Sequence, residues 1–137
     1  MPFSTRIPVR FGDTDPAGFV YYPNLLHYFH VAMEEFFAAR CGISYQRLMA
    51  EERTGFPTVK VEAEFFVPLM YGDEALVEVI VHAVGRSSAT FDYSIRRAGD
   101  HVLCARGRLV HVAMNLDERC AVTISDDLRR AFGQSAT

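Results

Sequence analysis

The chain has 137 residues and a formal net charge of -3, and half of its residues are apolar. This length suits a single domain over residues 1–137 with enough apolar side chains for a core. The charge balance lacks the basic surface of a nucleic-acid-binding protein, and no apolar run reaches the roughly 18 residues of a membrane span. The start, MPFSTRIPVRF, does not resemble a secretion signal, so we expect a cytoplasmic protein.

The three cysteines are widely spaced along the chain, at Cys41, Cys104 and Cys120. Their odd number and wide spacing indicate neither a disulfide framework nor a zinc ribbon. Cys41 and Cys104 lie in apolar stretches, and we expect them to serve as packing residues.

The first predicted element is a strand over residues 3–11. Apolar residues and threonine alternate there with Arg6 and Arg10, which is the two-residue period of a strand, and Phe11 falls on the apolar face. A turn with the sequence GDTDPAG follows the strand, because glycine, aspartate and proline favour turns.

A long helix is predicted from about Pro23 to Arg40. Its apolar surface is so wide that we expect other elements to enclose it. Its narrow polar stripe consists of His27, His30 and Glu34.

The rest of the chain is mainly strand. Residues 43–57 form a short helical piece and a loop, and a last short helix follows a cap at Ser125. The strands alternate or are rich in β-branched residues, and they cover residues 58–65, 75–84, 88–97 and 101–114. One strand, one long helix and several antiparallel strands predict an α+β fold, in which a sheet wraps around the helix.

The segment FGDTDPAGFVYYPN, residues 11–24, carries the chemistry of greatest interest. It places Asp13 and Asp15 in a tight turn shortly before a helix begins. A helix start has unpaired N–H groups and positive partial charge, so it can stabilise an oxyanion. A nearby carboxylate can attack a carbonyl or activate a water. The residues alone leave two alternatives open: the aspartates shape the turn, or they bind a metal.

The same segment resembles the signature D-x-D-x-x-G-x-V-[YFW]-[YFH]-x-N of the 4-hydroxybenzoyl-CoA thioesterase branch of the hotdog superfamily. The resemblance continues, in the family's order, through EFFVPLMYGDEALVEV, VGRSSATFDYSI and VHVAMNLDERCAVTISDDLRRAF. It implies a hotdog fold, with an antiparallel sheet wrapped around a long central helix. It also implies an acyl-CoA thioester hydrolase without a cofactor, since CoA is part of the substrate.

The family's catalytic carboxylate corresponds to Asp15, which acts as nucleophile or general base. Asp13 is then expected to support the turn. The resemblance further implies that the backbone N–H of Tyr22 polarises the thioester carbonyl. Gly18 is expected to permit close approach of the backbone to the substrate.

Substrate-binding residues are expected further along the chain. The family meets the CoA phosphates near the position of Arg86, where Ser87 or Ser88 can add hydrogen bonds; the alternative is a solvated turn arginine. In the 4-hydroxybenzoyl enzyme an aspartate on the central helix accepts a hydrogen bond from the substrate's phenol. His30 occupies that position, and neutral imidazole can also accept such a bond. Because the aspartate is absent, the acyl group is not fixed by the resemblance, and His30 can instead bond to a helix neighbour.

The family's active sites lie between two subunits, so the resemblance implies a homodimer or a homotetramer made of two dimers. An aromatic acyl-CoA is the preferred substrate class, with short or medium aliphatic acyl-CoA as the alternative. Two further hypotheses are a non-catalytic acyl-CoA-binding protein and a hotdog dehydratase, although the dehydratase signature is not found.

Overall fold

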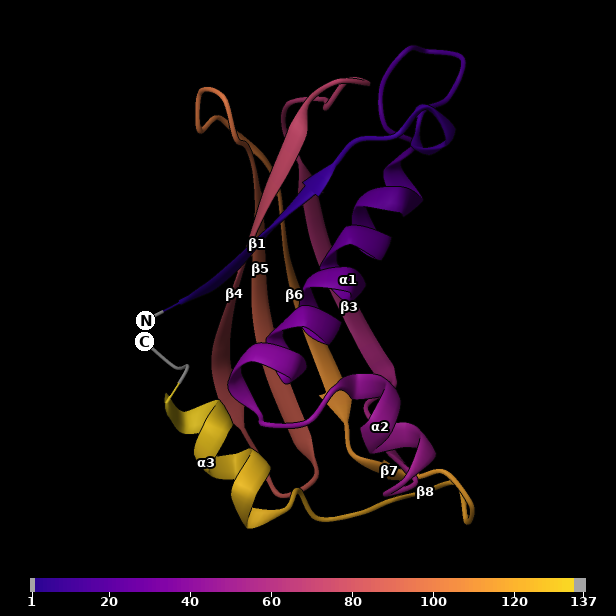
Figure 1. Cartoon of the computed structure of the whole chain (residues 1–137), viewed down its shortest axis with the longest axis vertical. Helices are drawn as coiled ribbons and strands as arrows, with labels where there is room; N and C mark the ends of the chain where they lie inside the picture. The colour runs from indigo at the N-terminus through magenta and orange to yellow at the C-terminus, as the bar shows by residue number, and fades with distance from the viewer. Residues whose placement is uncertain (1, 135–137) are drawn as a thin grey trace.

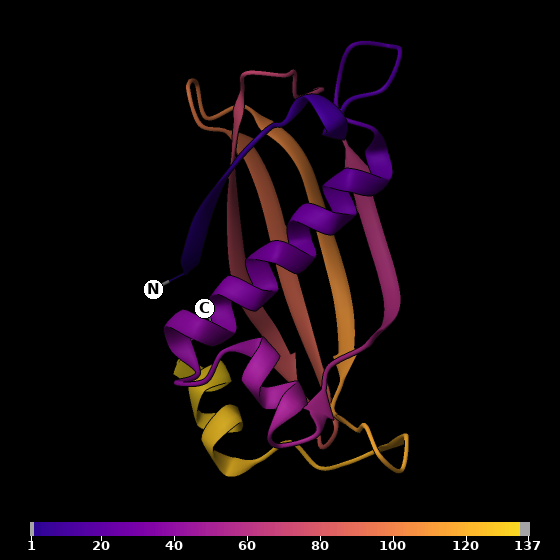
Figure 2. The same ribbon diagram turned by 45° about the vertical axis from the view of Figure 1, so that its right-hand side comes forward.

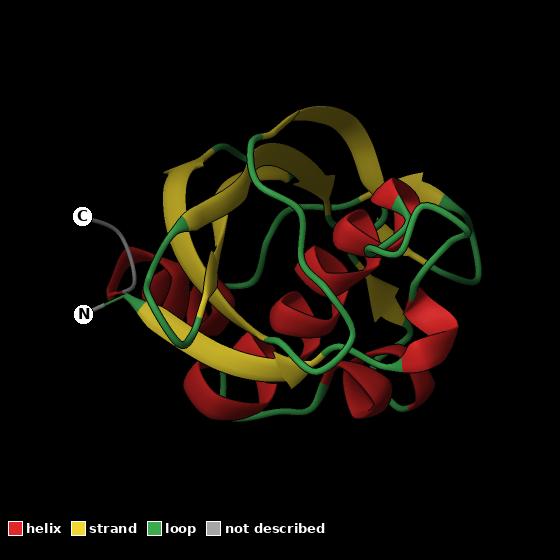
Figure 3. Cartoon of the chain, turned by 90° about the horizontal axis from the view of Figure 1, so that it is seen from above, coloured by secondary structure: helices red, strands yellow, loops and turns green. Residues whose placement is uncertain are grey.

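One antiparallel sheet curves around the long helix α1 in the computed structural model, which describes residues 2–134 (Figure 1, Figure 2). Its five strands lie in the order β1-β4-β5-β6-β3, and a small second sheet has the order β2-β7-β8. Seen from above, the strands curve around the helices (Figure 3). The elements are β1 (Phe3–Pro8), η1 (Phe11–Asp13), α1 (Tyr22–Arg40), α2 (Tyr45–Ala50), β2 (Thr54–Gly55), β3 (Thr58–Phe65), β4 (Glu74–Val84), β5 (Ser88–Arg97), β6 (Leu103–Val112), β7 (Met114–Asn115), β8 (Cys120–Ala121) and α3 (Asp126–Gln134).

The predicted architecture, a sheet wrapped around a long central helix, is therefore confirmed. The inner face of the sheet is built by two-residue alternation, with Ala75, Val77, Val79 and Val81 of β4 buried toward α1. The sequence favours β4 as the central strand. It is an interior strand between β1 and β5, but β5 occupies the middle of the sheet.

Aromatic side chains fill the core at the C-terminal end of α1. Phe36 and Phe37 are fully buried. The ring of Phe37 lies 5.3 Å from that of Phe56 and 5.8 Å from that of Phe132 on α3, while Phe36 lies 5.4 Å from Phe91 on β5. Rings at these separations contribute attraction beyond their buried area. This cluster joins α1, α3 and the sheet.

A glycine determines how closely α1 approaches the sheet. A Cβ atom at Gly107 on β6 would lie 2.7 Å from Cε2 of Phe29, well inside the roughly 3.5–4.0 Å of a carbon–carbon contact. The missing side chain lets Phe29 stack on Tyr93 of β5, with ring centroids 5.1 Å apart.

The first strand is shorter than predicted. β1 ends at Pro8, and Phe11 belongs to the 3-10 turn η1, where it is 75% exposed instead of facing the core. The cause is Asp13, whose carboxylate accepts the Arg10 N–H at 3.0 Å and closes the chain into a turn.

Strand β3 is an edge strand with apolar side chains in solvent. It pairs with β6 on one side, and no strand of the described range 2–134 covers its other edge. Val59, Val61 and Phe65 are 63%, 47% and 45% exposed. An uncovered edge of this kind is a template for pairing with another chain.

No helix within residues 2–134 combines the length and apolar character needed to cross a membrane.

Candidate active site

Asp13 is used to hold the loop that precedes α1. Its carboxylate accepts the hydroxyl of Tyr28 at 2.7 Å as well as the Arg10 N–H. Its carbonyl accepts the Tyr21 N–H and the side-chain amide of Asn24, both at 2.9 Å. Burial, followed by the bond to Asp13, raises the pKa of Tyr28 well above its usual range, so the phenol stays a donor. Asp13 therefore has the supporting role that the sequence predicts for it.

Asp15 begins a second, tighter turn in the same loop. Its N–H donates to the Phe19 carbonyl at 3.0 Å, and its carbonyl accepts the Gly18 N–H at 2.9 Å. Gly18 has a φ of +93°, a conformation that favours glycine. The Oδ1 atom of Asp15 accepts the Ala17 N–H at 2.9 Å, whereas Oδ2 has no hydrogen-bond donor among residues 2–134. One oxygen thus orients the partly exposed carboxylate and leaves the other for a ligand.

Tyr22 is the first residue of α1, and its backbone N–H is the free donor of this helix start. Pro23 has no N–H to offer. The N–H groups of Tyr21 and Asn24 already bond to Asp13 and Tyr21. The Tyr22 N–H has no partner within the helix, and no bond inside the described residues uses it. The bridge between Thr14 and Val20 closes the loop, so Asp15 and Tyr22 belong to one compact unit.

Exposed aromatic side chains surround this loop. The ring of Tyr22 lies 5.4 Å from that of Tyr21 and 6.1 Å from that of Phe65 on β3, and the Phe11 ring lies 5.9 Å from that of Tyr71. These five rings are each at least 45% exposed. Clustered exposed apolar residues mark binding surfaces, so this end of the molecule is suited to a ligand or a second chain.

A separate pocket opens beside the middle of α1. It has a volume of about 460 Å³. His30 and Glu34 of α1 line it, with Nε2 of His30 lying 3.4 Å from Oε2 of Glu34. The other lining residues come from α2, from the loops and from the small sheet: Tyr45, Gln46, Met49, Gly55, Pro57, Met114 and Leu116. The pocket is largely apolar with one polar side.

The predicted phosphate-binding residues lie at the other end of the sheet. Arg86 and Ser87 lie in the turn from β4 to β5 and Ser88 begins β5, next to α3, while the Asp15 loop is at the opposite end (Figure 1). Within one chain the structure does not bring these residues together with Asp15. The turn is well held, because Arg129 of α3 donates to the carbonyls of Gly85 and Arg86 at 3.0 and 3.2 Å.

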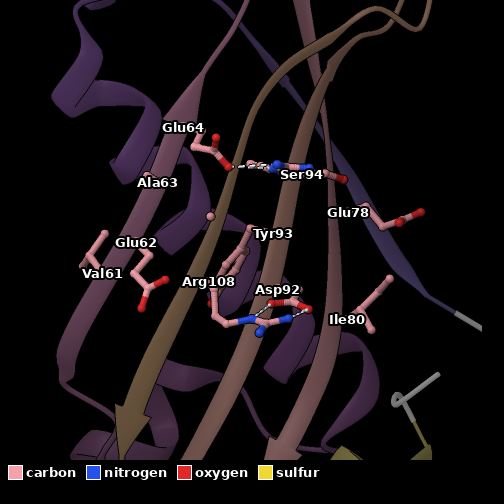
Figure 4. A pocket seen from close by; sticks show the side chains of 12 residues that line it. Val61, Glu62, Ala63, Glu64, Glu78, Ile80, Asp92, Tyr93, Ser94 and Arg108 are labelled. Carbon is pink, nitrogen blue, oxygen red and sulfur yellow. Dashed lines mark hydrogen bonds and ion pairs between the residues drawn. The ribbon is translucent and has the colours of Figure 1, made fainter.

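The outer face of the sheet carries a larger hollow of about 830 Å³ (Figure 4). Its walls are cross-strand ion pairs: Arg108 forms two bonds with Asp92, at 2.7 and 3.0 Å, and Arg106 pairs with Glu64 at 2.9 Å. Charged side chains on the solvent side of an antiparallel sheet are expected. Its lining carries many more charged side chains than the pocket beside His30, and neither Asp15 nor Tyr22 belongs to it, so we do not assign it to the active site.

Comparison with known proteins identifies the family. Residues 9–132 match the profile described as the thioesterase-like superfamily. The chain belongs to this superfamily. A 1,4-dihydroxy-2-naphthoyl-CoA hydrolase of Prochlorococcus marinus (strain MIT 9515) is 30% identical over 127 residues, covering 89% of this chain and 83% of the relative. A hydrolase of the same name from Synechocystis sp. is 31% identical over 117 residues, covering 85% and 84%.

Solved structures agree with this assignment. The crystal structure of a 1,4-dihydroxy-2-naphthoyl-CoA thioesterase from Synechocystis has a TM-score of 0.87 at 28% identity, covering 97% of this chain and 96% of that one. A gentisyl-coenzyme A thioesterase, 24% identical, shares the fold with a TM-score of 0.84. The predicted hotdog fold and the predicted class, an acyl-CoA thioester hydrolase, are confirmed.

Sequence reasoning missed most of the pocket beside His30. It placed His30 and Glu34 on one polar stripe, which was a usable signal. The remaining walls depend on the pairing of Thr54 with Asn115 between β2 and β7. Those strands have two residues each, too few for a periodic pattern to indicate them.

Proposed function

We propose that the chain hydrolyses an aromatic acyl-CoA to the free acid and CoA, with Asp15 as nucleophile or general base. The observation that carries this proposal is that two groups without partners among the described residues lie in the loop before α1 and at the first position of α1. One is the Oδ2 atom of Asp15, and the other is the backbone N–H of Tyr22 at the start of α1. An acid next to an oxyanion-binding donor is the minimum equipment for acyl transfer to water.

The mechanism follows from these positions. The thioester oxygen accepts the Tyr22 N–H, and the positive end of α1 stabilises the charge that develops on that oxygen. Asp15 either attacks the carbonyl carbon to form a mixed anhydride that water then cleaves, or removes a proton from the attacking water. The thiolate of CoA leaves without strong acid assistance. Gly18, which has no side chain, leaves room for the substrate next to the turn.

The aromatic acyl group is supported by two observations. Relatives about as long as this chain are 1,4-dihydroxy-2-naphthoyl-CoA hydrolases at about 30% identity. The pocket beside His30 is largely apolar, and it is about 460 Å³ in volume, which suits a ring system. His30 lies eight residues after Tyr22 on α1, which corresponds to about 12 Å along the helix axis. This separation is comparable with the length of an aryl thioester together with a hydrogen bond at each end.

A second copy of the chain completes the proposed site. Pairing of the two β3 edges about a two-fold axis would run the strands antiparallel and cover Val61 and Phe65. Such a pairing brings the Arg86 end of one chain toward the Asp15 end of the other. Arg86, Ser87 and Ser88 of the second chain would then bind the CoA phosphates. A homodimer, alone or within a homotetramer, is therefore part of the proposal.

An acyl-CoA panel tests the proposal directly. Release of free thiol is followed with benzoyl-, 4-hydroxybenzoyl-, phenylacetyl-, 1,4-dihydroxy-2-naphthoyl- and aliphatic acyl-CoAs, using wild type and Asp15→Asn. We expect turnover of aryl thioesters by wild type and its loss in the variant. Preference for aliphatic chains would overturn the acyl assignment alone. Tight binding of every thioester without turnover would contradict the proposed hydrolysis and favour an acyl-CoA-binding protein.

A further inference from the structure

Leu116 lines the apolar pocket at the end that is farther from Asp15. It directly follows β7, and Gly55 of the neighbouring strand β2 lines the pocket beside it. The small sheet that carries both residues lies near the end of the molecule opposite the Asp15 loop (Figure 1). An acyl group that extends from Tyr22 along α1 and past His30 therefore reaches Leu116 last.

The side chain of Leu116 packs directly on the backbone of Gly55. A Cβ atom at position 55 would lie 3.1 Å from Cδ2 of Leu116 and 3.7 Å from its Cδ1 and Cγ atoms, and these are the three nearest atoms. Carbon atoms in contact are usually about 3.5–4.0 Å apart, so a methyl group at position 55 would displace Leu116. Gly55 is buried and Leu116 is half-buried. The two residues thus form one wall of the pocket.

Hydrogen bonds on both sides of Leu116 hold its backbone in place. The Leu116 N–H donates to the Arg53 carbonyl at 2.8 Å, and Nε of Arg53 donates to Oδ1 of Asp117 at 3.0 Å. The side-chain oxygen of Asn115 accepts the N–H groups of Asp117 and Glu118, both at 2.9 Å. A shift of the chain at Leu116 away from a longer acyl group would strain these bonds.

The other long apolar side chains of the pocket are better able to adapt to a ligand. Met49 of α2 and Met114 of β7 also line it. Methionine is unbranched and fills irregular spaces with little preference for one shape. Leu116 is branched and rests on a buried backbone, so it is the more rigid limit to the pocket.

We infer that Leu116, supported by Gly55, is the specificity-determining residue that limits the length of the acyl group. This inference rests on the proposed function and narrows its substrates to aryl groups that end before this wall. A benzoyl group is short enough to do so. A biphenyl-4-carbonyl group carries a second ring in line with the first, so it extends further along α1 and meets Leu116.

The main test compares biphenyl-4-carbonyl-CoA with benzoyl-CoA in wild type, Leu116→Ala and Leu116→Val. The quantity measured is the ratio of kcat/KM for the longer substrate to that for the shorter one, which does not depend on the fraction of enzyme that is folded. We expect the ratio to rise by at least about tenfold in Leu116→Ala, because one methylene in a hydrophobic pocket is worth about that factor or more. It should rise less in Leu116→Val.

Val122→Ala is the matched control for this test. Val122 is also a half-buried aliphatic residue and directly follows β8 of the same small sheet, but it does not line the pocket. The control should keep the wild-type ratio.

A double variant tests the contact between Leu116 and Gly55. With 4-methylbenzoyl-CoA as the longer substrate, Gly55→Ala should lower the ratio, because the added methyl group enlarges the same wall. The same substitution should have a much smaller effect in the Leu116→Ala background, where the side chain that it would displace is absent. Equal effects in both backgrounds would remove Gly55 from the inference.

An unchanged ratio in Leu116→Ala, with turnover of benzoyl-CoA still dependent on Asp15, would overturn the inference and leave the proposed function intact. So would equal turnover of both substrates by wild type, or an equal rise of the ratio in Val122→Ala, which would indicate general loosening of the small sheet. If wild type hydrolysed no thioester at all, the proposed function itself would fail.

Discussion

The two ends of α1 have opposite characters. At the C-terminal end, Phe36 and Phe37 are fully buried against α3 and the sheet, and they contribute to folding. At the N-terminal end, Tyr21 and Tyr22 are 48% and 59% exposed, and no hydrogen bond within residues 2–134 uses the Tyr22 N–H. One helix thus has a packed end that stabilises the fold and an exposed end where we propose the chemistry. Substitutions at the two ends should accordingly affect different measurements.

The largest effect is expected at the packed end. Phe37→Ala removes a ring that contacts Tyr45, Phe56 and Phe132, and it should lower the free energy of unfolding by about 3–5 kcal/mol. Urea denaturation measures this loss. The protein that remains folded should keep its kcat, because the cluster does not touch the Asp15 loop. A loss below about 1 kcal/mol would show that the core at this end repacks easily.

At the other end, Asp15→Asn should lower kcat by at least about 10²-fold, or about 2.7 kcal/mol in the activation barrier. The midpoint of unfolding should stay within error of wild type, because the amide keeps the oxygen that accepts the Ala17 N–H. Steady-state kinetics and thermal melts on the same preparation make the comparison. A variant that loses stability instead of activity would return Asp15 to a purely structural role.

A smaller effect on the free energy of unfolding is expected from a change of pH, through a histidine buried against the sheet. Burial, and to a lesser degree the nearby His30, lower the pKa of His111 to about 4. Its nitrogens contact Thr58 at 3.0 Å and Tyr93 at 2.8 Å. The unfolded state binds the proton first, near pH 6.5, so stability falls as the pH drops from 6.5 toward 4. Between pH 7 and 5 we expect a loss of about 2 kcal/mol from this group, which urea titrations should find absent in His111→Gln.

The smallest effect on stability is expected at Tyr28, which joins α1 to the loop before it. Tyr28→Phe removes the hydrogen bond to Asp13 and should cost about 1 kcal/mol of unfolding free energy. Because Asp13 holds the loop before α1, kcat should fall as well, by less than in Asp15→Asn. Tyr21→Phe is the matched control, since no hydrogen bond of its hydroxyl lies within the described residues. Equal behaviour of both variants would remove Asp13 from the support of the site.

The elements that sequence patterns predicted well are those with local causes. The long apolar stretch of α1 fits its helix within one residue of the predicted start, and Ser125 caps α3 by accepting the Leu128 N–H at 3.3 Å. The end of β1 was not predictable in this way. It depends on Asp13, whose second partner, Tyr28, lies 15 residues further on. A pattern read over a few neighbouring residues cannot indicate a contact between residues that far apart in the sequence.

The candidate site shows the same difference between residues close together in the sequence and residues far apart in it. Asp15, Gly18 and Tyr22 lie in one continuous segment, so a signature could point to all three. The turn of Arg86 lies at the opposite end of the sheet, and only a second chain could bring it to Asp15. The sequence motifs give the order of these residues along the chain, whereas their meeting at one site depends on the proposed dimer.

The missing side chain of Gly107 has a consequence for how relatives of this protein diverge. Any larger residue there would clash with Phe29, which is fully buried between α1 and the sheet. We therefore expect the distance between α1 and the sheet to change little as substrate preference diverges. We expect divergence to be concentrated around Met49 of α2 and Met114 of β7, which line the pocket, because these short elements lie apart from the Asp15 loop.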